Sequence, residues 1–272
     1  MKYLILALVL VCLPGCYEAP DGDSPEPSSR PSNDKKMGHF LKTDTEILAN
    51  LEQHLGLVAV EQGGEGRCLF HSLREQVTQA ELVSIKNLFS DALQAQMNAY
   101  STLTPDDKAD LLRALAIAYE KDFIVTKNNK AKDFTALNKQ DQAWVLEMAK
   151  DFYEELGHDR DKTRAWFHAN KGSSAGRQIL WKYIVDNRDA YWAKTSCVTN
   201  WAGSAEAIVF ARLLQRPLRM YGMDLVTSLD GAELDQQGVV KPYLNYDFSY
   251  KNPPLLVYQT MGGGHYNMLK SK

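Results

Sequence analysis

The sequence predicts an α+β domain with a small β-sheet. Three observations support this fold class. Apolar residues recur at helical spacing through most of residues 43–214, short apolar runs bounded by turn residues gather near the C-terminus, and no internal repeat is present. A chain of 272 residues is also long enough for one sizeable core. Helices that come first and strands that come late are typical of α+β domains.

The first expected helix follows residues 43–46, Thr-Asp-Thr-Glu, which form a capping box. Its apolar pattern ends at Gly56, because glycine readily adopts the left-handed conformation that closes a helix. We then expect a short strand at 57–61, a glycine-rich turn, and a helix from Cys68 to about Val77.

The middle of the chain is strongly helical. Thr104 and Pro105 open one helix with an N-cap residue and a proline in the first turn. The expected helices occupy residues 81–100, 104–123, 139–156, 177–185 and 205–214. Buried strands are expected at 218–221, 255–259 and 266–269.

The N-terminus resembles a bacterial lipoprotein signal. Lys2 precedes an apolar run at 4–13, which is shorter than the ~20 residues that cross a bilayer. Residues 13–16, Leu-Pro-Gly-Cys, resemble the lipobox, where a signal peptidase cuts before a lipidated cysteine. We expect Cys16 to carry acyl chains that anchor the protein in the cell envelope, at the outer membrane or cell surface. A conventional signal with an incidental Cys16, or a buried N-terminal strand, remains the alternative.

Three parts are therefore expected: a signal peptide at 1–15, a tether at 16–38 and a globular domain at 39–272. The tether is rich in Pro, Ser, Asp and Gly, and it has too few apolar residues to offset the chain entropy of folding. A formal net charge of −3 provides no basic surplus for neutralising phosphates, so we expect no nucleic-acid partner.

Cys68 and Cys197 are the cysteines expected in the domain, and a disulfide between them would consume any nucleophile at Cys68. A glycine-rich turn delivers Cys68 to the start of a helical segment, where backbone N–H groups and the helix dipole favour a thiolate with a lowered pKa. The same N–H groups can form an oxyanion hole. The alternative is that Cys68 is a small buried hydrophobe, which is how most such cysteines behave.

His265 follows three glycines, which allow the backbone to come close to a ligand. Side chains alternate along a strand, so His265 and Asn267 are expected on the same face, where Asn267 can fix the imidazole tautomer. A surface histidine after a flexible turn is the alternative. His39, His54, His158 and His168 show no spacing typical of zinc ligands, so we expect no metal.

Three segments resemble motifs of the ovarian tumour (OTU) family of cysteine proteases. Residues 65–73, Glu-Gly-Arg-Cys-Leu-Phe-His-Ser-Leu, resemble the nucleophile motif Asp-Gly-Asn-Cys-Leu-Phe-Arg-Ala-Leu. Residues 201–206, Trp-Ala-Gly-Ser-Ala-Glu, resemble Trp-Gly-Gly-x-x-Glu, and residues 265–267 resemble the closing His-Tyr-Asn. The resemblance extends over residues 58–269 and implies a papain-like fold, here with an enlarged helical region.

The resemblance implies a deubiquitinase that needs no cofactor and cuts after the C-terminal glycine of ubiquitin or a ubiquitin-like protein. Cys68 would be the nucleophile, His265 the base and Asn267 the residue that holds the base. The remaining implied site residues are Glu65, Gly66 and Arg67 at the oxyanion hole, and Trp201, Gly263 and Gly264 at the substrate channel.

Glu65 and Arg67 replace the Asp and Asn of the family motif, and Glu65 is the first alternative for the third catalytic residue. Bacteria generally lack ubiquitin, so the lipobox indicates either a host's ubiquitin or another substrate. Two other functions therefore stay open. One is a Cys-His amidase or peptidase of the cell envelope, and the other is a degenerate OTU-like domain that only binds ubiquitin.

Overall fold

Helices supply most of the described chain, and the strands come mainly from its C-terminal part. The computed structural model describes residues 40–63, 66–125, 134–197, 200, 202–224, 226, 231–260 and 265–272. These residues contain both helices and β-sheet, so the expected α+β class is confirmed. The expected signal peptide (1–15), the lipidated Cys16 and the tether (16–38) lie outside the described residues.

The larger sheet has the strand order β2-β7-β6-β3-β5. Its strands are β2 (Leu57–Val60), β3 (Leu218–Gly222), β5 (Leu244–Tyr246), β6 (Leu255–Gln259) and β7 (Tyr266–Ser271). Strands β3 and β6 are parallel, whereas the other neighbouring pairs are antiparallel. Two shorter strands, β1 (Phe40–Leu41) and β4 (Ala232–Glu233), pair with each other outside this sheet.

Strands β2, β3, β6 and β7 are the four that the sequence predicts. Strands β1, β4 and β5 were not predicted, because two or three residues are too few to show an alternating pattern. These short strands add only edges and a small side sheet, so the predicted strands account for the centre of the fold.

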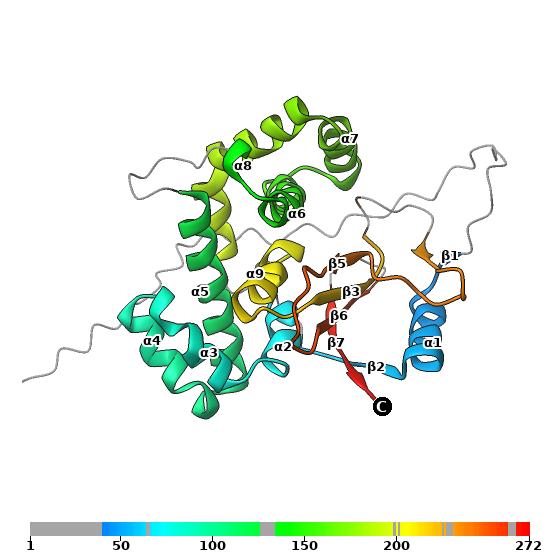
Figure 1. Ribbon diagram of the computed structural model, residues 1–272, viewed down its shortest axis with the longest axis horizontal. Coiled ribbons are helices and arrows are strands. Elements are labelled where there is room, and N and C mark those ends of the chain that lie inside the picture. Colours follow the sequence, from blue (N-terminus) through cyan, green and yellow to red (C-terminus); the bar gives the residue numbers. More distant parts are fainter. Residues whose placement is uncertain are drawn as a thin grey trace, which may run out of the picture. The chain divides into compact units, whose positions relative to one another are not determined.

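Helices cover both faces of the larger sheet, because side chains alternate along each strand. In β6, Val257 belongs to the main core with α2 (Cys68–Arg74) and α9 (Ser204–Leu214). Its neighbour Tyr258 belongs to a smaller core with α1 (Asp44–Leu55). Figure 1 shows α1 on one side of the strands, and α2 and α9 on the other.

Helix α1 begins and ends where the sequence predicts. The Thr43 hydroxyl accepts a hydrogen bond from the Glu46 N–H (3.2 Å), and the Glu46 carboxylate accepts one from the Thr43 N–H (3.1 Å). Gly56 closes the helix with a φ of 63°. Both ends therefore follow from local sequence alone.

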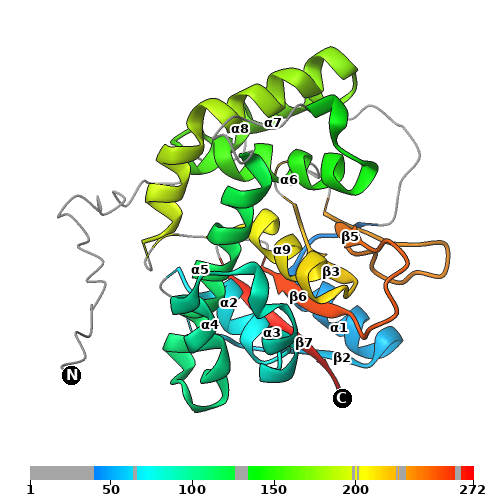
Figure 2. The same ribbon diagram turned by 60° about the vertical axis from the view of Figure 1, so that its left-hand side comes forward.

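A helical region lies between α2 and α9 in the sequence. It comprises α3 (Gln79–Ile85), α4 (Asp91–Asn98), α5 (Pro105–Ile124), α6 (Lys139–Glu155), α7 (Arg160–Lys171) and α8 (Ser174–Thr195). Helices α6, α7 and α8 pack against one another, while α5 contacts both α2 and α9. Figure 2 shows α7 and α8 at the top and the strands below them.

Some helix predictions are corrected by the structure. Residues 81–100 form two helices rather than one, because the backbone at Phe89 is extended (φ −123°, ψ 165°) and α4 begins afresh beyond it. The helix expected at 177–185 continues to Thr195, and α7, which begins after the cap residue Asp159, was not predicted. Within the described residues, no helix is both long and apolar enough to cross a membrane.

Gln76 fastens the end of α2 to strand β6. Its side-chain amide donates a hydrogen bond to the Leu256 carbonyl (2.9 Å) and accepts one from the Leu256 N–H (2.8 Å). Both backbone groups of one strand residue are thus bound by a single side chain. Helix α2 ends at Arg74 rather than at the expected Val77, and Gln76 follows directly in the turn that leads away.

Candidate active site

Cys68 is the first residue of α2, and its side chain is only 1% exposed. The turn before it passes through Gly66 with a φ of 77°. Glycine adopts this left-handed conformation without steric cost, which explains why the chain has glycine at that position. The position that the sequence predicts for Cys68, at a helix start after a glycine turn, is confirmed.

The Cys68 thiol lies beside the start of β7. Burial raises the pKa of this thiol above its usual range, whereas the backbone N–H groups of Tyr266, Leu69 and Cys68 and the charge of Arg113 act in the opposite direction. The expectation of a lowered pKa is therefore wrong for the free protein, because desolvation outweighs the helix start. The Tyr266 contact nevertheless places the thiol next to the residue that follows His265.

His265 immediately precedes β7 and is partly buried. Its carbonyl oxygen accepts a hydrogen bond from the Thr260 N–H (3.0 Å), which ties His265 to the end of β6. The Nε2 atom is buried and has no hydrogen-bond partner among the described residues. A buried ring nitrogen without a partner is costly to keep, so this histidine is not explained by packing alone.

Asn267 lies in β7 and is 9% exposed. Its side-chain oxygen accepts a hydrogen bond from the backbone N–H of Gln62 (3.1 Å), just beyond β2. Among the described residues, no hydrogen bond joins Asn267 to His265. The structure thus places Asn267 in β7, two residues after His265, but it engages the amide with the segment that leads to the nucleophile turn. The sequence analysis did not single out Gln62.

Residues 203–206 of the second motif form the cap and the first turn of α9. The Glu206 carboxylate accepts hydrogen bonds from the Gly203 N–H (2.8 Å) and from the Tyr191 hydroxyl of α8. Asp151 of α6 accepts one from the Ala205 N–H (2.8 Å). A Cβ atom at Gly203 would lie 2.4 Å from the Asp151 carboxylate, so any larger residue would displace the side chain that caps α9. These contacts explain the Gly and Glu of the motif as structural residues.

Two arginines join the nucleophile turn to α5. Arg67 donates to the carboxylate of Asp110 through Nε (2.9 Å) and Nη2 (3.2 Å). Arg113, one turn further along α5, donates to the carbonyl oxygens of Gly66 (2.7 Å) and Thr195 (2.8 Å). The sequence analysis missed Arg113. Its signal is a charged residue within an apolar stretch of a helix, where a buried charge requires partners.

The remaining predicted site residues are Glu65 of the nucleophile turn and Trp201, Gly263 and Gly264 of the substrate channel, and all four lie outside the described residues. Their roles stay predictions. Cys68 and Cys197 are not joined in a disulfide, so the thiol required at Cys68 is present. Within the described part of the chain, no group of three or more His, Cys, Asp and Glu side chains is arranged to hold a metal ion.

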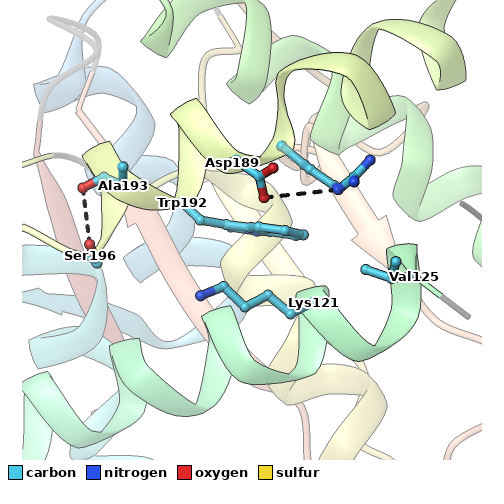
Figure 3. Close-up of a pocket in the computed structure, with 7 residues that line it drawn as sticks. Lys121, Val125, Asp189, Trp192, Ala193 and Ser196 are labelled. Atoms are coloured by element: carbon cyan, nitrogen blue, oxygen red, sulfur yellow. Dashed lines mark hydrogen bonds and ion pairs between the residues drawn. The ribbon is translucent and has the colours of Figure 1, made fainter. Parts of the chain in front are cut away.

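A pocket of about 470 Å³ lies between α5 and α8, away from Cys68 and His265. Its lining residues are Lys121, Val125, Arg188, Asp189, Trp192, Ala193 and Ser196. Figure 3 shows the Trp192 ring edge-on above the Lys121 side chain, whose ammonium lies 5.5 Å from the ring centroid. The Trp192 N–H donates to buried Glu120 (3.3 Å). The pocket wall therefore connects directly to the interior of the helical region.

No protein-family model matches the sequence. A comparison with characterised proteins likewise finds no sequence match. The assignment of a function therefore depends on the three short motifs and on the arrangement of the residues described above.

Proposed function

We propose that the protein is a thiol-dependent hydrolase, with Cys68 as nucleophile and His265 as base. The observation that carries this proposal is the position of the Cys68 thiol. It lies at the start of a helix and against the backbone N–H of Tyr266, the residue that follows His265. The buried Nε2 atom of His265, which lacks a partner among the described residues, supports the same assignment.

In the proposed reaction, His265 takes the proton from the Cys68 thiol, and the sulfur attacks the carbonyl carbon of the substrate. The C–N bond then breaks, and His265 returns the proton to the leaving amine. Water next attacks the thioester carbonyl and gives a proton to His265. The C–S bond then breaks, the carboxylic acid leaves, and His265 returns the proton to the Cys68 sulfur. Backbone N–H groups near Glu65, Gly66 and Arg67 are proposed to bind the oxyanion during both steps.

We further propose that the substrate is a ubiquitin or ubiquitin-like protein, cut after its C-terminal glycine, and that the domain has a papain-like OTU fold. Support comes from the three motifs in the family's order and from the helix-strand pair, α9 and β3, that follows the second motif. A narrow channel suits a glycine at the cleavage site, and Trp201, Gly263 and Gly264 are the proposed walls. A lipid at Cys16 would hold the enzyme at the cell envelope, where host ubiquitin is the expected partner.

Two other functions have specific observations behind them. The lipobox resemblance at 13–16 favours an envelope amidase or peptidase with the same nucleophile and base. The 1% exposure of Cys68 and the raised pKa of its thiol, which follows from burial, favour a domain that binds ubiquitin without cutting it. Apo active sites often tighten only around substrate, so the covered thiol does not decide against an enzyme.

Ubiquitin carrying a C-terminal thiol-reactive group separates the three functions. An adduct that forms with the wild type and with Cys197→Ala, but not with Cys68→Ala, is the expected result. Ubiquitin that binds in calorimetry without forming an adduct would point to the binding domain. If ubiquitin neither forms an adduct nor binds, the ubiquitin proposal is overturned and the envelope substrate is favoured.

A further inference from the structure

Arg113 is a buried cation next to the candidate nucleophile. It lies in the middle of α5 and is 3% exposed. Moving a charged group out of water is costly, so such a residue persists only where its contacts repay the cost. Two of the contacts of Arg113, with the Gly66 carbonyl and the Phe70 ring, lie on either side of Cys68 in the sequence, which places this arginine at the candidate site.

The guanidinium of Arg113 bridges two backbone segments. One nitrogen donates to the carbonyl oxygen of Gly66, two residues before Cys68, at 2.7 Å. The other donates to the carbonyl oxygen of Thr195, at the end of α8, at 2.8 Å. The guanidinium also lies over the ring of Phe70 in α2, 4.9 Å from the centroid. Because a peptide unit is planar, a bond to the Gly66 carbonyl fixes the orientation of the peptide between residues 66 and 67.

Arg67 makes the reciprocal contact. It belongs to the nucleophile turn and binds Asp110 of α5 with two nitrogens, a planar fork that a lysine cannot reproduce. The nucleophile turn and α5 thus each contribute one arginine that binds the other segment. The turn before Cys68 is held by α5 at two successive residues, and this gives the helical region a role at the candidate site.

We propose that Arg113 is a positioning residue of the candidate active site, which fixes the turn before Cys68 and keeps a permanent positive charge beside the thiol. This proposal depends on the proposed function for its effect on turnover, but its effect on the thiol is independent of any substrate. A guanidinium remains charged at neutral pH, so its electrostatic effect is present throughout the working range.

Electrostatics agrees with this placement. Burial raises the pKa of Cys68, and the charge of Arg113 acts to lower it, after the larger effect of the backbone N–H groups of Tyr266, Leu69 and Cys68. Burial also lowers the pKa of Arg113, while the carboxylates of Glu206 in α9 and Asp110 in α5 raise it. The other charged or titratable groups that interact with this pair are Arg67 of the nucleophile turn and Cys197 beyond α8, which act on Arg113, and Tyr266 at the start of β7, which is acted on by Cys68.

The test measures alkylation of Cys68 by iodoacetamide as a function of pH, with mass spectrometry resolving the Cys68 peptide. Arg113→Gln removes the charge but retains a hydrogen-bond donor, and Arg113→Lys retains the charge. The matched control is Arg216→Gln, because Arg216 is also buried (8% exposed) and also binds backbone carbonyls, including that of Pro253 (2.7 Å). Circular dichroism establishes that each variant is folded.

We expect Arg113→Gln to move the alkylation profile upward by about one pH unit, which corresponds to about tenfold less thiolate at a given pH. Arg113→Lys and Arg216→Gln should keep the wild-type profile. If Arg113 had only a structural role, Arg113→Gln and Arg216→Gln would destabilise the protein in the same way, and their alkylation profiles would not differ. An unchanged profile in Arg113→Gln, or an equal displacement in Arg216→Gln, overturns the proposal.

If Arg113→Gln does not fold, Arg113→Lys tests the positioning role of Arg113 by itself. A lysine carries the charge but cannot span both carbonyls, so the alkylation profile should stay while kcat for ubiquitin hydrolysis falls and KM is kept. A profile displaced upward by a unit in this variant overturns the proposal. Absence of any ubiquitin hydrolysis in the wild type would overturn the proposed ubiquitin substrate and leave the alkylation result standing, so the two failures are distinguishable.

Discussion

The side-chain oxygen of Asn267 accepts a hydrogen bond from the backbone N–H of Gln62 at 3.1 Å. This contact joins β7 to the segment between β2 and the nucleophile turn, so that the strand following His265 and the approach to Cys68 are held by one amide. In the free protein Asn267 therefore holds β7 and the segment before the nucleophile turn in position relative to each other. Any direct hold on the imidazole has to form later, with substrate present.

Asn267→Ala should slow turnover and still leave some activity, whereas Cys68→Ala and His265→Ala should abolish covalent catalysis. General-base catalysis contributes roughly 10²–10⁴-fold, and losing only the alignment of the base costs less than losing the base. The variant should also lose about 1–3 kcal/mol of unfolding free energy, because the Gln62 N–H is left buried without an acceptor. Steady-state kinetics and urea denaturation measure the two effects.

Asn267→Asp is the matched control, since aspartate keeps an acceptor for the Gln62 N–H. It should be more stable than Asn267→Ala. If Asn267→Ala retains full activity in a folded protein, the third catalytic residue lies elsewhere, and Glu65 is the first alternative to replace.

The sequence predicts the helices and strands that carry this site better than the contacts between its side chains. The capping box of α1 and the proline start of α5 are local signals, and both helices begin where expected. Long-range contacts are not readable in this way: neither the approach of Arg113 to Gly66 nor that of Gln62 to Asn267 follows from any spacing.

The direction of the Cys68 pKa shows the same limit. A helix start lowers a thiol pKa by a local effect, whereas burial depends on everything packed around the thiol. Sequence reasoning detects the first contribution and not the second. The same applies to α7, which has a suitable cap at Asp159 but whose apolar side is defined by its packing on α6 and α8.

Cys197 should react with iodoacetamide before Cys68 in the native protein. Cys197 is partly buried, whereas Cys68 is 1% exposed. Burial raises the pKa of the Cys68 thiol, so its thiolate is scarce at neutral pH and its alkylation should increase steeply only above the usual thiol value of ~8.5. Peptide mass spectrometry at several pH values measures both rates. Rapid modification of Cys68 at pH 7 would contradict the buried arrangement.

Cys16→Ala should abolish lipidation if residues 13–16 are a lipobox. The mature wild type should begin at Cys16 and partition into detergent, because acyl chains bind strongly to apolar phases. Intact-mass spectrometry of both proteins measures the N-terminus and the added lipid. A wild-type protein with an unmodified N-terminus at another residue would contradict the lipoprotein prediction.

Glu120 and Asp151 of the helical region and Glu206 of α9 form a cluster of buried carboxyl groups. Burial raises the pKa of Glu120 well above its usual range, and the charge of Glu206 adds to this effect. For such a group the protonated form is favoured in the folded state. Its contribution to stability is therefore present below the unfolded pKa of ~4.3 and is lost as pH rises through the folded pKa.

Glu120→Gln should become more stable relative to the wild type as pH rises above ~4.3, by about 1.4 kcal/mol per pH unit until the folded pKa is reached. Glutamine stays neutral and keeps an acceptor for the Trp192 N–H. Urea denaturation at pH 5 and pH 8 measures the difference. Asp161→Asn is the control, because the Asp161 side chain is 92% exposed. A constant difference between Glu120→Gln and the wild type would contradict the prediction.

Lys150 of α6 is 5% exposed, and its ammonium lies 2.7 Å from the carboxylates of both Glu147 and Asp224. Although burial alone would lower the pKa of Lys150, Glu147 and Asp224 raise it above its usual range. Asp224 follows β3 and also accepts a hydrogen bond from the Val226 N–H (2.9 Å). The triad therefore joins the helical region to the end of a central strand.

Lys150→Met should lower the unfolding free energy by about 3–5 kcal/mol, because the substitution leaves two buried carboxylates without their cation. Lys182→Met is the matched control. Lys182 is 75% exposed and pairs with Asp186 four residues along α8, a contact worth no more than about 0.5 kcal/mol. Urea denaturation at neutral pH measures both variants, with circular dichroism as the probe. Equal losses in the two proteins would mean that the buried triad contributes no more than a surface pair, and the link between α6 and β3 would then depend on apolar packing alone.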